Sequence, residues 1–221
     1  MKKKSLVGLL QNVNDFDAPK VTLEQYMTGP QVAADWLYIA SQTYGDVKQK
    51  LVADLGCGTG MLTTGLAALG ASLVLGIDVD SKAISSCKQN IVELFDGEDA
   101  AKVDLICADV CHIFNDTERS KLNGLEHKAF DVVFMNPPFG TKRNAGLDMK
   151  FLRCGLSLAS DCVYSLHKTS TREHIVQKAS DWGATPTVLG EFVYDLPATY
   201  RFHKQRSVDI AVDLIRCVLN H

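Results

Sequence analysis

The 221-residue sequence lacks the long features that mark several protein classes. No stretch approaches the roughly 18 consecutive apolar residues of a membrane span, so no membrane partner is expected. The apolar run at residues 6–10 is too short for a secretory signal. Repeats and low-complexity blocks are also missing. A hydrophobic content of 46% argues against disorder, and a formal charge of −3 argues against indiscriminate nucleic-acid binding.

Paired, closely spaced cysteines are missing as well. The seven cysteines are an odd number and no C-x-x-C motif occurs, which argues against a disulfide framework and against a zinc finger. Cys107, Cys111 and His112 form a loose cluster, where free thiols are favoured over a metal site. We therefore expect no bound metal and a reducing compartment, the cytosol or the nucleus.

Short β-rich runs alternate with helical patterns along most of the chain. Strands are predicted at 51–54, 73–78, 103–107, 131–136 and 161–166. Helices are predicted at 31–43, 61–69, 81–94, 149–159 and 170–182, the last opening on a capping box of Ser170 and Glu173. This alternation predicts an α/β fold with a parallel sheet and helices on both faces. Runs 188–194 and 208–218 have no helix between them and predict an antiparallel pair added to the sheet.

Polar residues end four of the predicted strands or follow them closely. They are Asp54, Asp78, Asp109 and Asn136. Ligands of open α/β sheets bind at the carboxyl ends of the strands, so these side chains are expected along one rim. A single acid there is usually a turn or a helix cap, whereas four in series favour a binding site.

The glycine-rich segment after the first strand reads Asp54-Leu55-Gly56-Cys57-Gly58-Thr59-Gly60. Glycines allow a sharp turn and a close approach to a ligand, which the amides of the next helix then face. A dinucleotide fingerprint would need glycine at position 61, where Met61 stands, and a P-loop would need Lys-Ser/Thr. Asp54 would repel phosphates but suits an amino group. The segment therefore favours S-adenosylmethionine over NAD.

The two later acids suit the rest of such a cofactor. A carboxylate at Asp78 can accept hydrogen bonds from both ribose hydroxyls. Asp109 could accept from the adenine amino group while the Val110 amide donates to a ring nitrogen. A helix cap is the competing interpretation of Asp109.

The second motif is Asn136-Pro137-Pro138-Phe139. It suits methyl transfer to a conjugated nitrogen, such as an adenine N6 or a glutamine amide, whose lone pair is delocalised. The Asn136 side-chain oxygen and the Pro137 carbonyl would accept from the NH₂ group and direct its lone pair to the methyl group. No strong general base is required. Pro138 has no N–H to compete for the acceptors, and Phe139 offers a face for stacking the target base.

These motifs resemble those of class I methyltransferases that act on exocyclic amines. Family-specific segments recur in order, namely Leu23-Glu24-Gln25-Tyr26, Met135-Asn136-Pro137-Pro138-Phe139-Gly140-Thr141-Lys142, Tyr164-Ser165-Leu166-His167-Lys168, Tyr194-Asp195-Leu196-Pro197-Ala198 and Ser207-Val208-Asp209-Ile210. Over nearly its full length the chain resembles the methyltransferase-like protein 5 family, eukaryotic enzymes that make N6-methyladenosine in 18S ribosomal RNA.

The resemblance implies a Rossmann-like class I methyltransferase fold with a seven-stranded, mostly parallel sheet and an antiparallel last strand. Residues 1–221 would form one domain, with 1–45 covering the cofactor site and 46–221 forming the core sheet. S-adenosylmethionine would be the cofactor and S-adenosylhomocysteine the product. The resemblance places catalysis at Asn136 to Phe139. It implies a cofactor pocket of Gln25, Thr28, Gly56, Thr59, Met61, Asp78, Asp109 and Val110, to which the motif adds Asp54, Gly58 and Gly60.

The resemblance also implies partners. They are 18S rRNA or a small-subunit precursor, and a small zinc-binding activator of the tRNA methyltransferase subunit 11-2 type that forms a heterodimer. The activator would pair a strand with the exposed strand 103–107 at the sheet edge. Nucleus, nucleolus and cytoplasm are the expected locations. Segments 96–102 and 115–128 look longer than is usual in the family.

Positive charge collects after the second motif. Residues 142–206 hold ten Lys and Arg against six Asp and Glu, a surplus of +4. Residues 200–206 interleave basic and aromatic side chains, as binding of single-stranded RNA requires. Lysines 2–4 could add a flexible basic arm. The predicted RNA-binding residues are Lys142, Arg143, Lys168, Arg172, Arg201, His203, Lys204 and Arg206.

Two other functions remain open from the residues alone. A protein-glutamine N5 methyltransferase uses a similar motif, usually Asn-Pro-Pro-Tyr, and Phe139 with the basic aromatic segment favours a nucleobase instead. A non-catalytic cofactor-binding or RNA-binding subunit would be expected to lose the glycine-rich segment or Asn136, and both are intact.

Overall fold

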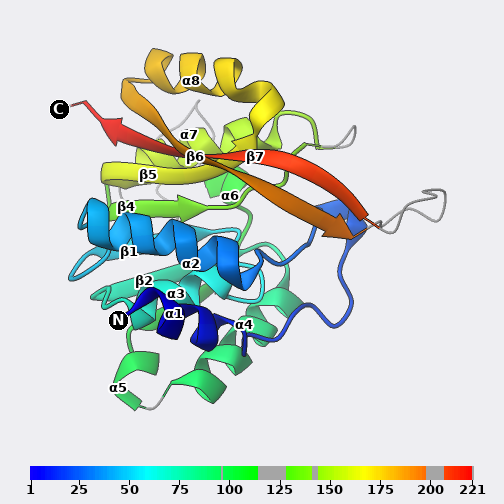
Figure 1. Cartoon of the computed structure of the whole chain (residues 1–221), viewed down its shortest axis with the longest axis vertical. Helices are drawn as coiled ribbons and strands as arrows, with labels where there is room; N and C mark the ends of the chain where they lie inside the picture. Colours follow the sequence, from blue (N-terminus) through cyan, green and yellow to red (C-terminus); the bar gives the residue numbers. More distant parts are fainter. Residues whose placement is uncertain (96, 114–127, 141–143, 198–206, 221) are drawn as a thin grey trace.

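A single mixed sheet with helices on both faces organises the chain (Figure 1). The computed structural model describes residues 1–95, 97–113, 128–140, 144–197 and 207–220. The strands are β1 (Leu51–Leu55), β2 (Leu73–Asp78), β3 (Val103–Cys107), β4 (Phe130–Met135), β5 (Ala159–Lys168), β6 (Ala184–Pro197) and β7 (Ser207–Leu219). The α-helices are α1 (Lys3–Leu10), α2 (Pro30–Tyr38), α3 (Met61–Ala68), α4 (Ser81–Leu94), α5 (Gly97–Ala100), α6 (Val110–Ile113), α7 (Leu147–Leu158) and α8 (Arg172–Asp181).

The strand order is β3-β2-β1-β4-β5-β7-β6. Strands β1 to β5 are parallel, and β7 is antiparallel to both β5 and β6. The predicted mostly parallel sheet with an antiparallel last strand is confirmed, and β7 lies between β5 and β6. The order places β3 at one edge and β6 at the other, so β3 is the predicted edge strand.

Each inner strand divides its side chains between two apolar layers, because successive residues point to opposite faces of a sheet. Val52 and Val132 pack with α1, α2 and α3, whereas Ala53 and Val133 pack with α7 and α8. Figure 1 shows these helices on the two faces of the sheet. The double burial explains why the inner strands read as continuous apolar runs in the sequence.

Two local predictions are wrong. The capping box of Ser170 and Glu173 does not form, because α8 follows a 3₁₀ turn, Thr169–Thr171, and the Thr171 hydroxyl donates to the Lys168 carbonyl at 2.8 Å. The N-terminal lysines do not make a flexible arm either. Lys3 lies in α1 and forms an ion pair with Asp35 of α2.

Strand β6 contains a bulge that the sequence did not reveal. Val188 pairs with Ile215 and Gly190 pairs with Leu214, so Leu189 has no partner of its own in the register. Beyond the bulge, pairing with β7 continues to Pro197 opposite Ser207. The long hairpin therefore extends past Lys168, the last residue of β5.

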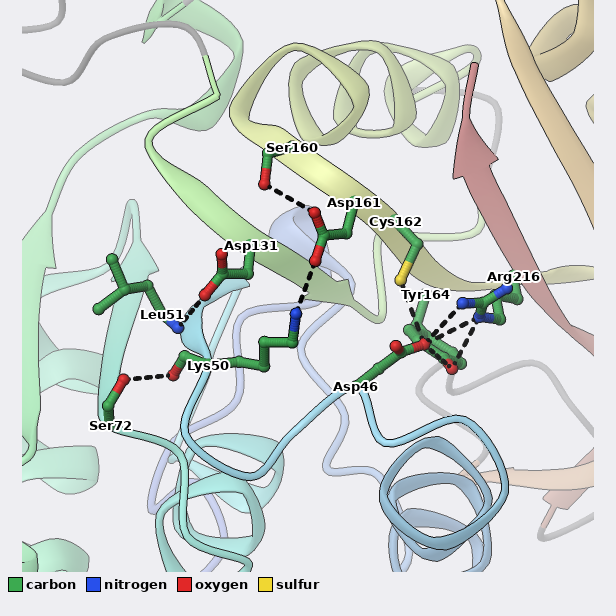
Figure 2. Close-up of polar contacts among 10 residues, drawn as sticks. All are labelled: Asp46, Lys50, Leu51, Ser72, Asp131, Ser160, Asp161, Cys162, Tyr164 and Arg216. Atoms are coloured by element: carbon green, nitrogen blue, oxygen red, sulfur yellow. Dashed lines mark hydrogen bonds and ion pairs between the residues drawn. The ribbon is translucent and has the colours of Figure 1, made fainter. Parts of the chain in front are cut away.

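A polar cluster stabilises the opposite end of the sheet, where β1, β4 and β5 begin (Figure 2). Asp46 Oδ2 accepts hydrogen bonds from Tyr164 OH at 2.7 Å and from Arg216 Nε at 2.9 Å. The Arg216 guanidinium also lies 4.5 Å from the centre of the Tyr44 ring. This cluster connects the segment before β1 to β5 and β7.

Among the described residues, no helix is long and apolar enough to cross a membrane.

Candidate functional site

A cavity of about 460 Å³ opens at the carboxyl ends of β1, β2 and β4. That volume suits a small organic ligand. The predicted residues that line it are Gln25, Thr28, Asp54, Gly56, Gly58, Thr59, Met61, Asp78, Asp109, Val110, Asn136 and Pro138. Gly60, Pro137 and Phe139 are not among the lining residues, although they belong to the same two motifs.

The glycine-rich loop folds tightly over the end of β2. The amides of Gly56 and Cys57 donate to the Ile77 carbonyl at 2.8 and 3.1 Å. Gly58 has a φ of +55°, and a Cβ there would lie 2.9 Å from the ring of Phe16. The backbone angle therefore favours glycine at this position, and a larger residue would have to displace the Phe16 ring. Gly60, with a φ of +94°, precedes the first residue of α3.

Asp54 is buried at the end of β1, where its Oδ2 accepts a hydrogen bond of 2.6 Å from the Thr63 hydroxyl of α3. Burial raises the pKa of the Asp54 carboxyl from 3.8 to about 7. A cationic group placed beside this carboxyl would stabilise its charged form. Among the described lining residues, carboxylates outnumber lysines, since Glu24, Asp54, Asp78 and Asp109 face a single lysine, Lys150. The cavity therefore favours a positively charged ligand.

Asp78 and Asp80 connect the loop to the N-terminal segment. Asp78 accepts from the amides of Gly58 at 2.9 Å and Asp80 at 2.8 Å, and burial raises its pKa. Asp80 binds Lys20 Nζ and Gln25 Nε2, each at 2.8 Å, and the hydrogen bond from Lys20 contributes most to lowering its pKa. Gln25 thus lines the cavity while its amide group is bonded to Asp80.

Further contacts hold the N-terminal segment along the cavity. Asn90 Nδ2 of α4 donates to the carbonyls of Asn14 and Thr59, at 3.1 and 2.9 Å. Asn144 Nδ2 donates to the Thr22 carbonyl at 3.1 Å from the side of the second motif. The segment 14–28 is therefore bonded on both sides of the cavity. Residues of this segment line the cavity, and their role in covering a cofactor stays a prediction.

Asp109 caps the short helix α6. Its Oδ1 accepts from the Cys111 amide at 2.8 Å, and its Oδ2 lies 2.8 Å from His112 Nδ1. The structure therefore confirms the interpretation of Asp109 as a helix cap. Asp109 also lines the cavity next to Val110, so a role in cofactor binding stays a prediction.

Asn136 follows β4 and is held by its amide nitrogen. Nδ2 donates to Thr28 Oγ1 at 2.9 Å and to Tyr194 OH at 3.0 Å. Oδ1 is buried and has no hydrogen-bond partner among the described residues. A buried carbonyl oxygen without a partner costs about 1–3 kcal/mol, which a donor on a bound ligand would recover. The arrangement thus offers an acceptor at the position where the motif predicts a substrate amino group.

Phe139 does not offer a free face for stacking. It is 7% exposed, and the ring of Tyr26 stacks on it with centroids 5.5 Å apart and planes 19° apart. Tyr194 contacts both rings edge-on. Three aromatic residues from distant parts of the chain therefore enclose this side of the site, and a target base would have to displace or separate Tyr26 to stack on Phe139.

Most of the predicted RNA-binding residues lie outside the described residues, namely Lys142, Arg143, Arg201, His203, Lys204 and Arg206. Lys168 ends β5 and is half-buried. Arg172 bonds two carboxylates, Asp213 Oδ1 at 2.6 Å and Glu191 Oε2 at 2.9 Å. Its charge is balanced within the protein, so the structure assigns Arg172 a role in holding α8 against the β6–β7 hairpin.

The sequence reasoning did not single out Asp80, Asn90, Asn144 or Tyr194 as site residues. Asp80 could have been found from its place two residues after Asp78, and Tyr194 from the family-specific segment that contains it. Asn90 and Asn144 had no comparable signal in the sequence.

The fold and the two motifs at the cavity define a class I methyltransferase. The family model for ribosomal protein L11 methyltransferase (PrmA) matches residues 37–136. The chain is 48% identical over 216 residues to rRNA N(6)-adenosine-methyltransferase METTL5 of Danio rerio, with 98% of each chain covered. It is 44% identical to the Mettl5 protein of Drosophila melanogaster, covering 98% of this chain and 96% of that one. The protein belongs to the METTL5 family.

A solved structure extends the similarity to archaea. The crystal structure of a candidate RNA methyltransferase from Pyrococcus horikoshii matches with a TM-score of 0.80 and 33% identity, covering 99% of this chain and 97% of that one. The whole described architecture, including the β6–β7 hairpin, therefore lies within a shared fold.

Proposed function

We propose that this protein transfers a methyl group from S-adenosylmethionine to the N6 amino group of an adenosine in 18S rRNA, in a heterodimer with a small zinc-binding activator. The curated relatives from fish and fly are named rRNA N(6)-adenosine methyltransferases, which supports the substrate class. One structural observation supports the chemistry most directly: Asn136 Oδ1 is buried at the cavity and has no partner within the described part of the chain.

The residues around the cavity fit S-adenosylmethionine. Its ammonium and sulfonium charges suit the acidic lining. It has no phosphate group, so its binding does not need the lysine of a phosphate-binding loop. Asp54 and the glycine-rich loop would hold the methionine part, Asp78 the ribose hydroxyls, and Asp109 with Val110 the adenine. Bound S-adenosylmethionine supplies an electrophilic methyl group and leaves as S-adenosylhomocysteine.

Asn136 and Pro137 would prepare the target nitrogen. Hydrogen bonds from the adenine NH₂ group to Asn136 Oδ1 and to the Pro137 carbonyl favour a pyramidal nitrogen, whose lone pair then forms the new N–C bond as the methyl leaves sulfur. The nitrogen becomes cationic and acidic after the transfer, and it then loses one proton to solvent. These residues therefore need to accept hydrogen bonds and need not act as a strong base.

The sheet edge supports a protein partner. β3 is an edge strand, Ile106 is 36% exposed, and the neighbouring Val79 is 50% exposed. An apolar edge strand with unpaired backbone groups favours addition of a strand from another chain. We propose that the activator binds here. As a methyltransferase of rRNA, the complex is expected in the nucleolus, the nucleus and the cytoplasm.

The primary test is methyl transfer by the purified heterodimer. With labelled S-adenosylmethionine, we expect label in 18S rRNA, recovered as N6-methyladenosine by nucleoside mass spectrometry, and none in a release factor. Label in protein alone would instead indicate the glutamine N5 activity. Asn136→Ala should keep cofactor binding in calorimetry and abolish transfer, and lost cofactor binding would contradict this division of roles.

The partner surface has a matched control at the other edge of the sheet. Ile106→Glu on β3 should prevent co-purification with the activator, because it places a charge on the proposed interface. Val193→Glu on β6, where Val193 is 67% exposed, should leave co-purification unchanged. Equal recovery of the activator with both variants would place its contact elsewhere.

A further inference from the structure

Tyr194 reaches the second motif from the far edge of the sheet. β5 and β7 lie between its strand, β6, and β4, which precedes Asn136. The Tyr194 side chain is nevertheless buried, 4% exposed, and its hydroxyl lies 3.0 Å from Asn136 Nδ2. The edge-on contacts with Tyr26 and Phe139, with ring centres 5.8 and 6.0 Å away, hold the ring in place.

The amide of Asn136 has both of its N–H groups in use. One donates to Thr28 Oγ1 and the other to Tyr194 OH. Thr28 and Tyr194 thus bind the same nitrogen from two different parts of the chain. Oδ1 takes no part in these contacts, and no described residue is hydrogen-bonded to it. The burial of Tyr194 raises its pKa, so the hydroxyl stays protonated and neutral.

We propose that Tyr194, together with Thr28, is a positioning residue that holds the Asn136 amide with its oxygen toward the substrate amine. A flipped amide would turn its NH₂ group toward the amine, donor against donor. It would also leave no acceptor open to that amine, because Oδ1 would then face the two hydroxyls. The two hydroxyls fix the plane of the amide, and the orientation that the structure shows leaves Oδ1 open to the substrate amine. The inference rests on the proposed role of Asn136 as acceptor.

Thr28 receives a different role from the one predicted for it. The sequence resemblance placed Thr28 in the cofactor pocket, and it does line the cavity. Its hydroxyl, however, accepts from Asn136. If Thr28 positions the amide, loss of its hydroxyl should lower the rate of transfer and not the affinity for the cofactor.

Kinetics of the heterodimer separate positioning from binding. Tyr194→Phe keeps the ring and removes the hydroxyl, and we expect kcat to fall about tenfold, the effect of losing one hydrogen bond in the transition state, with the cofactor Kd unchanged within about twofold. Thr28→Val should show a similar fall, and Thr28→Ser should restore the rate. Tyr44→Phe, in the cluster at the opposite end of the sheet, is the matched control and should be unchanged. An unaltered kcat in Tyr194→Phe would overturn the inference.

A second measurement does not depend on activity. In ¹⁵N-labelled protein, the Asn136 side-chain amide, assigned by its loss in Asn136→Asp, should exchange with solvent at least about tenfold more slowly than exposed asparagine amides. Tyr194→Phe should shift this signal and accelerate its exchange, whereas Tyr44→Phe should not. An Asn136 signal that is unaffected by Tyr194→Phe refutes the positioning role. Absent transfer by the wild-type heterodimer, with this NMR response intact, would refute only the proposed function.

Discussion

The buried carboxyl of Asp54 should make the cofactor-free protein less stable as the pH rises toward neutrality. Its folded-state pKa of about 7 lies above the ordinary value of 3.8, so the folded state binds this proton more tightly than the unfolded state does. The stabilising contribution is present below the ordinary pKa and is lost as pH rises toward 7. The gap between 3.8 and about 7 corresponds to roughly 4 kcal/mol.

Asp54→Asn removes this titration while keeping the shape of the side chain. We expect the variant and the wild type to unfold with similar free energies near pH 4. By pH 8 the cofactor-free variant should be more stable by up to about 4 kcal/mol. Urea denaturation across pH 4–8 measures the difference at each pH. A difference that does not change with pH would refute the reasoning.

Cofactor binding should release the proton of Asp54, so the affinity for the cofactor should rise with pH. An ammonium group beside Asp54 favours the carboxylate, so binding below pH 7 must release a proton, and affinity should fall about tenfold per pH unit. Calorimetry in buffers of different ionisation enthalpy counts the released protons. Asp54→Asn should bind the cofactor more weakly and release fewer protons. Equal proton release from both proteins would show that Asp54 does not contact the cationic group.

Two further predictions concern the loop and the amino end of the sheet. Gly58→Ala should weaken cofactor binding by about tenfold or more in calorimetry, because a Cβ meets the ring of Phe16 at 2.9 Å and the φ of +55° disfavours alanine. Unchanged affinity would mean that the loop can relax without cost. Asp46→Ala should lower the free energy of unfolding by about 3–5 kcal/mol in denaturant titrations, because it leaves Arg216 and Tyr164 without their shared acceptor. A loss below about 1 kcal/mol would show that the cluster contributes little.

The sheet could be predicted because its determinants are local in the sequence. Each inner strand is a short apolar run that alternates with helical patterns, so the alternation indicated the parallel sheet with helices on both faces. The edge position of β3 was implied by the family resemblance, and the strand order confirms it. The same logic brought Asp54, Asp78 and Asn136 to one rim, and the structure places them around one cavity.

Contacts between distant segments could not be predicted in this way. Asn136 is 108 residues from Thr28 and 58 from Tyr194, and no periodicity in the sequence relates them. The motif suggested an exposed Phe139 face because a motif does not show which side chain packs on it. Likewise Gln25 could be placed at the cavity, but its bond to Asp80 depends on the path of the N-terminal segment.

The bulge in β6 has a consequence for the active site. Ala184 and Val188, at even positions before Leu189, face the layer with α7 and α8, whereas Phe192 and Tyr194, also at even positions, face the layer with α1 and α2. The unpaired Leu189 therefore reverses which face the later residues occupy. A regular strand without the bulge would pair Leu189 with Leu214 and Tyr194 with Asp209, and it would turn the Tyr194 hydroxyl away from Asn136. The bulge at the far edge of the sheet therefore decides on which face the Tyr194 hydroxyl lies, and so whether it can reach Asn136.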